Sequence, residues 1–231
     1  MLFTNIAAAA DTSHCPMIRE QHVVGVGRHA VQIDVFRPRE EGVYPLVVLL
    51  HGSAGLYSDK KLDNLGEHEF ACSGRVAAIV HYLDVSNLRA VSSVHQMVEH
   101  GSEWLEAADA GLTAVLSLPY VRRSNVTLLG ESLGGYLAIG LGLSRKEVRT
   151  VVAYSAAIPH TLKLKQSNTP VVYLYHGSND AYISSKEAAQ SCAELRSIHC
   201  TCYLQEMRGP GHTLNQHALT KIRSNVIRVS K

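Results

Sequence analysis

One short segment of this 231-residue sequence has the residue types and spacing of an activated nucleophile. Residues 130–134 (GESLG) form a G-x-S-x-G string with Ser132 at its centre. An apolar run at 126–129 precedes the string, and a helix-like apolar pattern at 136–141 follows it. Between a strand and a helix, glycines permit a sharp turn that holds the serine hydroxyl out above the sheet. A serine hydroxyl is a weak nucleophile at neutral pH, so Ser132 requires a base within hydrogen-bond reach.

A base and an acid follow Ser132 in the chain order that such chemistry needs. Asp180 is the one aspartate after Ser132 and lies just beyond the apolar run 171–175. His212 follows the strand-like segment 201–207 and precedes a helical pattern. Open α/β sheets place their ligands at the carboxyl ends of parallel strands, and Ser, Asp, His is the order of this triad on a hydrolase sheet. The sequence predicts Ser132 as nucleophile, His212 as general base and Asp180 as the group that orients the imidazole.

Other residues compete for the roles of base and acid. His199 is predicted at a helix end and His217 inside a helix, so both are interpreted as surface or packing residues. Glu187, Glu194 and Glu206 are alternatives to Asp180, although the first two fall at helix positions.

The developing oxyanion needs preorganised donors, which are usually backbone N–H groups. The N–H of Leu133 follows the nucleophile and opens a helix, whose dipole favours negative charge. Ser53, in the turn after the apolar run 46–50, is predicted to supply the second N–H, with Ala54 as the alternative. His51 is interpreted as a structural support of that turn.

The elements that must position these residues alternate between strands and helices. Residues 30–37 alternate apolar and polar, which is typical of a half-buried strand. Continuous apolar runs indicate strands covered on both faces, and they lie at 46–50, 76–80, 126–129, 151–154 and 171–175. This pattern predicts an α/β fold with a doubly wound, mostly parallel sheet flanked by helices. We expect an N-terminal extension over 1–20 and a single catalytic domain over 21–231.

Helix signals separate these runs. Leu105, Ala108, Leu112 and Val115 recur at spacings of three and four, which predicts an amphipathic helix that ends before Pro119. Capping boxes predict a helix from 184 to about 198 and a C-terminal helix that opens at 213–216.

Four strings together give the chain a recognisable resemblance: LHGSAG at 50–55, GESLGG at 130–135, HGSND at 176–180 and GH at 211–212. The chain resembles the α/β-hydrolases, most of all the small, capless dienelactone hydrolase-like family. Dienelactone hydrolases proper use a cysteine nucleophile, whereas this sequence has Ser132. The resemblance implies a serine hydrolase without a cofactor or cap domain, acting on a small-molecule ester, lactone or thioester. We expect segments 83–100 and 158–164 to bound its pocket.

Several other functions remain alternatives on the sequence. A small serine peptidase resembling the prolyl oligopeptidase catalytic domain shares the elbow string, although the chain has no room for a gating domain. An acyltransferase of the same fold and a non-catalytic ligand-binding homologue are the other candidates. Covalent labelling of the serine separates the binding protein from the enzymes.

Composition excludes several further classes. Lys and Arg number 22 against 20 Asp and Glu, so the near-neutral chain lacks the basic footprint of a nucleic-acid binder. The 13 histidines are scattered, and the cluster at 67–69 (EHE) lacks the paired spacing of a metal site, so no metal is expected.

The five cysteines do not suggest a disulfide scaffold, and Cys200 and Cys202 are interpreted as buried thiols. No basic signal region opens the chain and no run spans a membrane, so we expect a cytoplasmic protein with no membrane partner. The oligomeric state cannot be read from the sequence.

Overall fold

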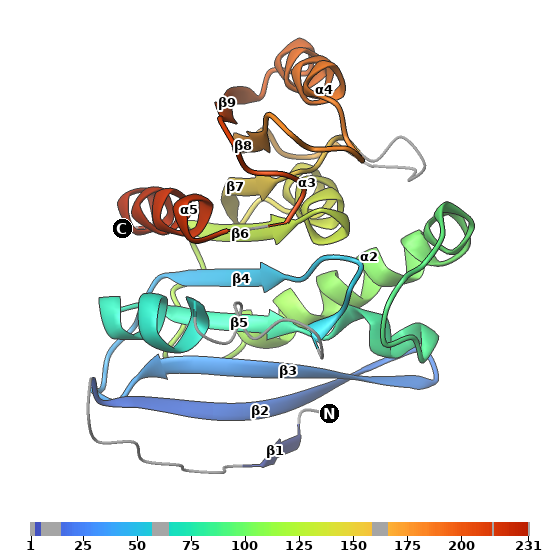
Figure 1. Ribbon diagram of the computed structural model, residues 1–231. Helices are drawn as coiled ribbons and strands as arrows, with labels where there is room; N and C mark the ends of the chain where they lie inside the picture. Colours follow the sequence, from blue (N-terminus) through green and yellow to red (C-terminus); the bar gives the residue numbers. More distant parts are fainter. Residues whose placement is uncertain (1–2, 6–14, 57–64, 159–165, 214, 231) are drawn as a thin grey trace.

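The computed structural model describes residues 3–5, 15–56, 65–158, 166–213 and 215–230 (Figure 1). Within them, nine strands form one sheet in the order β1-β2-β3-β5-β4-β6-β7-β8-β9. The strands are β1 (Phe3–Asn5), β2 (Met17–Val26), β3 (His29–Pro38), β4 (Leu46–Leu50), β5 (Val76–Val80), β6 (Val126–Glu131), β7 (Val148–Tyr154), β8 (Val171–Gly177) and β9 (Thr201–Met207). The longer helices are α2 (Val94–Leu116), α3 (Leu133–Ser144), α4 (Ser185–Ser197) and α5 (Gln216–Val229). No helix in the described ranges is long and apolar enough to cross a membrane.

Strands β4 to β9 are mutually parallel, and β1, β2 and β3 join the edge of this core in antiparallel pairing. The continuous apolar runs form the parallel strands, as predicted. All five residues of β4 have no exposed surface, because helices cover both faces of the sheet at its centre. The predicted α/β class with a doubly wound, mostly parallel sheet is therefore confirmed.

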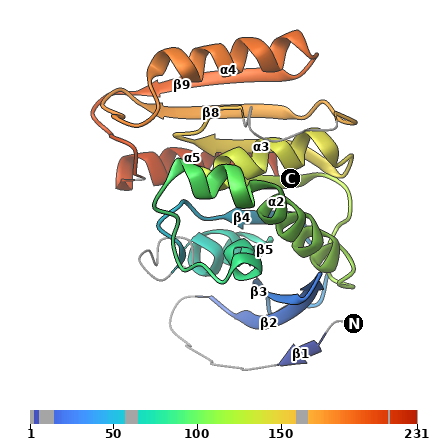
Figure 2. The ribbon, with the colours of Figure 1, turned by 90° about the vertical axis from the view of Figure 1, so that its right-hand side faces the viewer.

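The helices divide the core into two layers, one on each face of the sheet (Figure 2). Apolar side chains of α2, α3 and α4 pack on one face, together with alternate residues of β4 such as Val48. Those of α5 pack on the other face with Val47 and Leu49, and with a short π-helical turn, η2 (Leu65–Phe70). The alternation within one strand shows why the sequence there is apolar at every position.

Three details differ from the sequence predictions. Helix α2 begins at Val94, about three turns before the predicted periodic stretch. Helix α5 is capped by Asn215, whose side chain accepts from the N–H of Ala218, rather than by Thr213. Strand β2 begins at Met17, so the last residues of the expected 1–20 extension are paired in the sheet.

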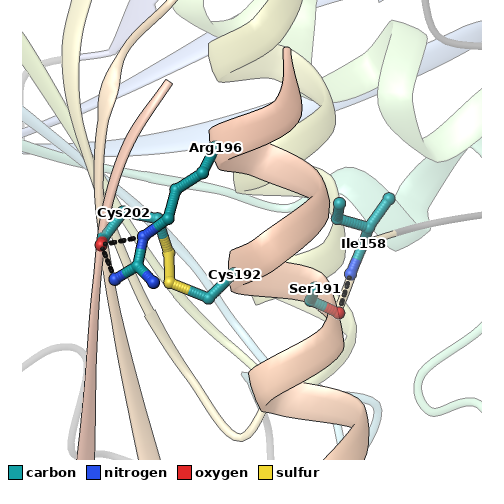
Figure 3. Close-up of a disulfide and its surroundings, with 5 residues drawn as sticks. All are labelled: Ile158, Ser191, Cys192, Arg196 and Cys202. Atoms are coloured by element: carbon teal, nitrogen blue, oxygen red, sulfur yellow. Dashed lines mark hydrogen bonds between the residues drawn. A yellow bond between two sulfur atoms is a disulfide. The ribbon is translucent and has the colours of Figure 1, made fainter. Parts of the chain in front are cut away.

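The cysteines also differ from the prediction, because four of them form disulfides. Cys192 on α4 is bonded to Cys202 on β9, so the interpretation of Cys202 as a free thiol is wrong (Figure 3). A second disulfide joins Cys15 to Cys72. Cys200 is a buried free thiol, as predicted. Sequence spacing alone cannot reveal such pairs, since they depend on Cα atoms being brought within about 4 to 7 Å by the fold.

Candidate active site

Ser132 stands at a tight turn between β6 and α3. Its backbone has φ 50° and ψ −117°, a conformation that non-glycine residues rarely adopt. The turn is possible because glycines surround it: a Cβ on Gly130 would overlap the backbone of Gly134, and a Cβ on Gly134 would overlap the carbonyl of Leu50. The strand-turn-helix context predicted for Ser132 is therefore present.

His212 lies between Ser132 and Asp180 and is hydrogen-bonded to both. Its Nε2 is 2.7 Å from Ser132 Oγ, and its Nδ1 is 2.9 Å from Asp180 Oδ2 and 3.0 Å from Oδ1. A carboxylate only accepts hydrogen bonds, so Nδ1 carries the proton in the neutral ring and Nε2 is free to accept from the serine hydroxyl. The structure thus brings together the three side chains that the sequence singled out.

The environment of Asp180 keeps it ionised. Its side chain has no exposed surface, and burial alone would raise its pKa. The backbone N–H groups of Ile183 and Tyr182 donate to Oδ1 at 3.0 and 2.9 Å, and together with His212 they lower the pKa of Asp180 below its ordinary value. A fixed, fully charged carboxylate can stabilise an imidazolium on His212.

Tyr154, at the end of β7, contacts the loop that carries His212, a contact that the sequence did not indicate. Its buried hydroxyl donates to the carbonyl of Gly211 at 2.8 Å and lies 3.4 Å from the carbonyl of Thr213. These two carbonyls flank His212, so the tyrosine holds the loop that carries the base. In the sequence, Tyr154 only ends an apolar run and gives no other signal.

The predicted oxyanion donors come from two separate segments of the chain. Ser53, from the turn after β4, and Leu133, the first residue of α3, both line the same pocket as Ser132. Leu133 opens the helix, where backbone N–H groups have no intrahelical partner. Ala54, the alternative donor, also lines this pocket.

His51 supports the turn that carries Ser53, as predicted. Its ring stacks on Tyr82 with centroids 4.2 Å apart, and the Tyr82 hydroxyl donates to the His51 carbonyl at 2.6 Å. Burial lowers the pKa of His51 to about 4, so the ring is neutral at pH 7. Its Nδ1–H then donates to the carbonyl of Gly52 at 2.8 Å.

None of the residues that competed for catalytic roles takes the place of Asp180 or His212 in this hydrogen-bonded series. His199 follows the end of α4 and His217 lies within α5, as predicted. Neither of them lines the pocket around Ser132, and the same holds for Glu194 and Glu206. Glu187 does line this pocket, from the first turn of α4, but Asp180 holds the position next to His212.

The pocket above Ser132 has a volume of about 950 Å³. One wall comes largely from the segment before α2 and its first two turns, and is apolar at Val94, Met97 and Val98. The other wall comes from the loop after Asp180, the start of α4 and Ile158, whose N–H donates to Ser191 of α4. Residues 91–94, 97 and 98 fall within the predicted segment 83–100, and Ile158 within 158–164. Residues 83–90 do not line the pocket, and 159–164 lie outside the described residues. Within the described ranges, no group of three or more His, Cys, Asp or Glu side chains is arranged to hold a metal ion.

The parallel sheet, the serine at a β6–α3 elbow, and an Asp and a His after successive later strands together define the α/β-hydrolase fold. The sequence model of the phospholipase/carboxylesterase family matches residues 87–229, more than half of the chain. The chain therefore belongs to the phospholipase/carboxylesterase family, which places it among the hydrolases.

Solved structures with the same fold include three small enzymes. Esterase PE8 is 18% identical, with a TM-score of 0.69, and the match covers 84% of this chain and 97% of that one. A putative dienelactone hydrolase from Klebsiella pneumoniae is 13% identical, with a TM-score of 0.73 and coverage of 92% and 98%. A cold-adapted esterase from an Arctic intertidal metagenomic library is 14% identical, with a TM-score of 0.74 and coverage of 97% and 99%. The resemblance to dienelactone hydrolase-like α/β-hydrolases is confirmed, whereas comparison with curated proteins gives no significant match.

Proposed function

We propose that this protein is a serine hydrolase that cleaves a carboxylic ester, lactone or thioester through an acyl-enzyme. The observation that carries the proposal is the continuous hydrogen-bonded series from Asp180 through His212 to Ser132 Oγ. It ends in an open pocket whose walls are mostly apolar. The membership of the phospholipase/carboxylesterase family supports the same reaction class.

In the first half-reaction, Ser132 Oγ attacks the substrate carbonyl carbon while His212 Nε2 takes the hydroxyl proton. Asp180 stabilises the imidazolium that forms. The negative charge on the carbonyl oxygen is proposed to lie against the backbone N–H groups of Leu133 and Ser53, each worth about 3 to 4 kcal/mol of barrier in comparable enzymes. The imidazolium then protonates the leaving oxygen or sulfur, and the acyl group remains on Ser132.

In the second half-reaction, His212 removes a proton from a water molecule that attacks the acyl-enzyme. Collapse of the tetrahedral intermediate releases the carboxylic acid and returns the proton to Ser132. Every proton moves through Nε2, so no cofactor or metal is required by this scheme.

The proposal is tested by replacing Ser132 with Ala. We expect Ser132→Ala to lower kcat for a short p-nitrophenyl ester at least 10⁴-fold, because the remaining groups cannot form the acyl-enzyme. The matched control is Ser197→Ala, which removes a hydroxyl from the far end of α4. Both variants should keep the wild-type circular dichroism spectrum.

A fluorophosphonate should label the wild type and the Ser197→Ala variant but not Ser132→Ala. Turnover retained by Ser132→Ala would contradict the proposed mechanism. A wild-type protein that reacts with neither ester nor phosphonate would favour a non-catalytic binding protein.

The cellular location also remains a proposal. The sequence predicts the cytoplasm, where thiols are normally kept reduced. The two disulfides, Cys15–Cys72 and Cys192–Cys202, oppose that prediction and favour an oxidising compartment.

A further inference from the structure

The wall of the pocket next to His212 carries a negative charge in a fixed position. Glu187 lies in the first turn of α4 and lines the pocket. Its Oε2 accepts from both the backbone N–H and the hydroxyl of Ser184, each at 2.7 Å, in a capping box. These hydrogen bonds lower the pKa of Glu187, and no ion pair to it occurs in the described part of the chain.

An aromatic ring stands beside this carboxylate wall. Tyr182 is 82% exposed and lines the same pocket. Its ring is tilted against the His212 ring, with centroids 5.0 Å apart. An exposed aromatic face attracts cations through its quadrupole, and more so next to an anionic group.

The opposite wall is built for an apolar group. Val94 and Val98, on the first two turns of α2, are 72% and 59% exposed and line the pocket with Met97. No Lys or Arg is among the described residues that line this pocket. The α2 side thus offers an apolar surface suited to an acyl chain, whereas the α4 side carries the carboxylate of Glu187.

The mechanism fixes which part of the substrate meets the α4 side. His212 Nε2 must deliver its proton to the leaving oxygen or sulfur, so the leaving group lies next to the His212 ring. Tyr182 packs against that ring, and Glu187 lines the same wall.

We propose that the pocket selects esters or thioesters whose leaving group carries a positively charged amine, and that Glu187 and Tyr182 are the residues that determine this specificity. The inference rests on the proposed function for the orientation of the substrate. It adds a substrate class, an apolar acyl group joined to a cationic alcohol or thiol.

Three thioesters with one acyl group and different leaving charges provide the test. They are the butyryl thioesters of thiocholine, 2-mercaptoethanol and 3-mercaptopropionate, which are cationic, neutral and anionic. The released thiol is followed with an aromatic disulfide reagent. We expect kcat/KM to fall in the order cationic, neutral, anionic, with about a fivefold span at low ionic strength, which shrinks in 0.5 M salt.

Matched variants separate the effect of the Glu187 charge from its structural role in the capping box of α4. Glu187→Gln keeps the capping box, because glutamine serves there as well as glutamate, but removes the charge. We expect Glu187→Gln to bring kcat/KM for the cationic and anionic thioesters close to the value for the neutral one, so that most of the difference between the three disappears. The control, Glu41→Gln, removes an equal charge from the turn before β4, at the opposite end of the sheet. It should keep the difference in kcat/KM between the three thioesters.

Tyr182 is tested in the same way. Tyr182→Phe keeps the aromatic face and should keep the preference for the cation. Tyr182→Leu removes the face and should lower the ratio of cationic to neutral rates about threefold.

Binding to the Ser132→Ala variant makes this inference independent of turnover. Ligand-observed NMR titration should give the same order of Kd for the three intact thioesters, and Glu187→Gln in that background should equalise them. If the wild type hydrolyses neither the thioesters nor the p-nitrophenyl ester, the proposed function is wrong, and the order of Kd still decides the inference. Equal Kd values, or an order unaffected by Glu187→Gln, would overturn the charge selection and leave the hydrolase proposal standing.

Discussion

At the scale of single residues, Tyr154 takes no part in proton transfer but holds the base in place. Its hydroxyl donates to the carbonyl of Gly211 on one side of His212 and lies 3.4 Å from the carbonyl of Thr213 on the other. We expect Tyr154→Phe to lower kcat for a p-nitrophenyl ester about tenfold, since small displacements of a catalytic group are costly. Loss of one hydrogen bond should reduce the free energy of unfolding by only about 1 kcal/mol.

Steady-state kinetics and urea unfolding measure both effects. Tyr173→Phe, on β8 at a distance from the pocket, is the control for removing a tyrosine hydroxyl. An unchanged kcat in Tyr154→Phe would show that the loop keeps His212 in position without this contact.

The residues of the candidate site differ in how well the sequence predicts their positions. The proximity of Ser132, Asp180 and His212 could be predicted because each follows a strand or strand-like segment, and their order along the chain matches a known chemistry. Tyr154 could not, because a tyrosine at the end of a buried run is equally consistent with packing. The role of Glu187 at the pocket wall also depends on the direction of α4, which the capping box by itself does not fix.

At the scale of elements, helix α4 is fastened to its surroundings at several points (Figure 3). The Cys192–Cys202 disulfide ties it to β9, and Arg196 donates to the carbonyl of Cys202 at 2.6 and 3.1 Å. Near its middle, Ser191 accepts from the N–H of Ile158 at 3.0 Å. The helix therefore presents the pocket wall from a well-supported position.

Replacing both Cys192 and Cys202 by Ser should lower the free energy of unfolding by about 2 to 3 kcal/mol, the entropy expected for a loop of this length. We expect kcat to change less than twofold, because the hydrogen bonds of Ser191 and Arg196 remain. Urea unfolding with and without a reductant measures the stability.

The corresponding Cys15→Ser, Cys72→Ser variant separates the contributions of the two disulfides. A large loss of activity in a fully folded Cys192→Ser, Cys202→Ser variant would mean that the Cys192–Cys202 disulfide itself positions the pocket wall.

Elements with a complete local signal were predicted well. The capping box at Ser184 and the strand Thr201–Met207 are present as expected. The start of α2 was missed because Gly101 and Ser102 interrupt the apolar spacing between Val98 and Leu105. The cap of α5 was misassigned because Thr213 and Asn215 are both good N-cap residues, and only the fold selects one of them.

At the scale of the whole molecule, Glu20 links strand β2, at the antiparallel edge of the sheet, to Tyr120 in the segment between α2 and β6. Its carboxylate accepts from Arg37 Nε at 2.7 Å and from the Tyr120 hydroxyl at 2.6 Å, and His22 Nε2 lies 3.1 Å away. The hydrogen bond with His22, followed by those of Tyr120 and Arg37, outweighs burial and lowers the pKa of Glu20 to about 2.

A lowered pKa in the folded state means that ionised Glu20 stabilises the protein fully above its ordinary pKa of 4.5, and that this stabilisation disappears as the pH falls toward 2. We expect Glu20→Gln to cost about 2 to 3 kcal/mol at pH 7, and the difference from wild type to shrink below pH 4.5. Urea unfolding at several pH values tests this. Glu41→Gln should show no such dependence, and a pH-independent cost in Glu20→Gln would assign the effect to packing alone.

The overall architecture could be predicted only in part. The alternation of apolar runs and helices was sufficient for the parallel core, because parallel neighbours require crossover connections. The antiparallel edge formed by β1 to β3 could not be predicted from this alternation. Strand β3 pairs with β5 rather than with β4, the next strand in the sequence, and this order depends on tertiary packing.

The bond between Cys15 and Cys72 also changes how the molecule would bear a mechanical load. A force applied to the N-terminus passes from Cys15 directly to Cys72, whose positions are 57 residues apart in the sequence. Strands β2, β3 and β4 lie within the bypassed segment. In a pulling experiment, about 200 Å of chain contour would stay hidden until a reductant is added. Strands β2 and β3 of the antiparallel edge are thereby shielded from tension applied at the N-terminus, whereas β1 precedes Cys15 and is not.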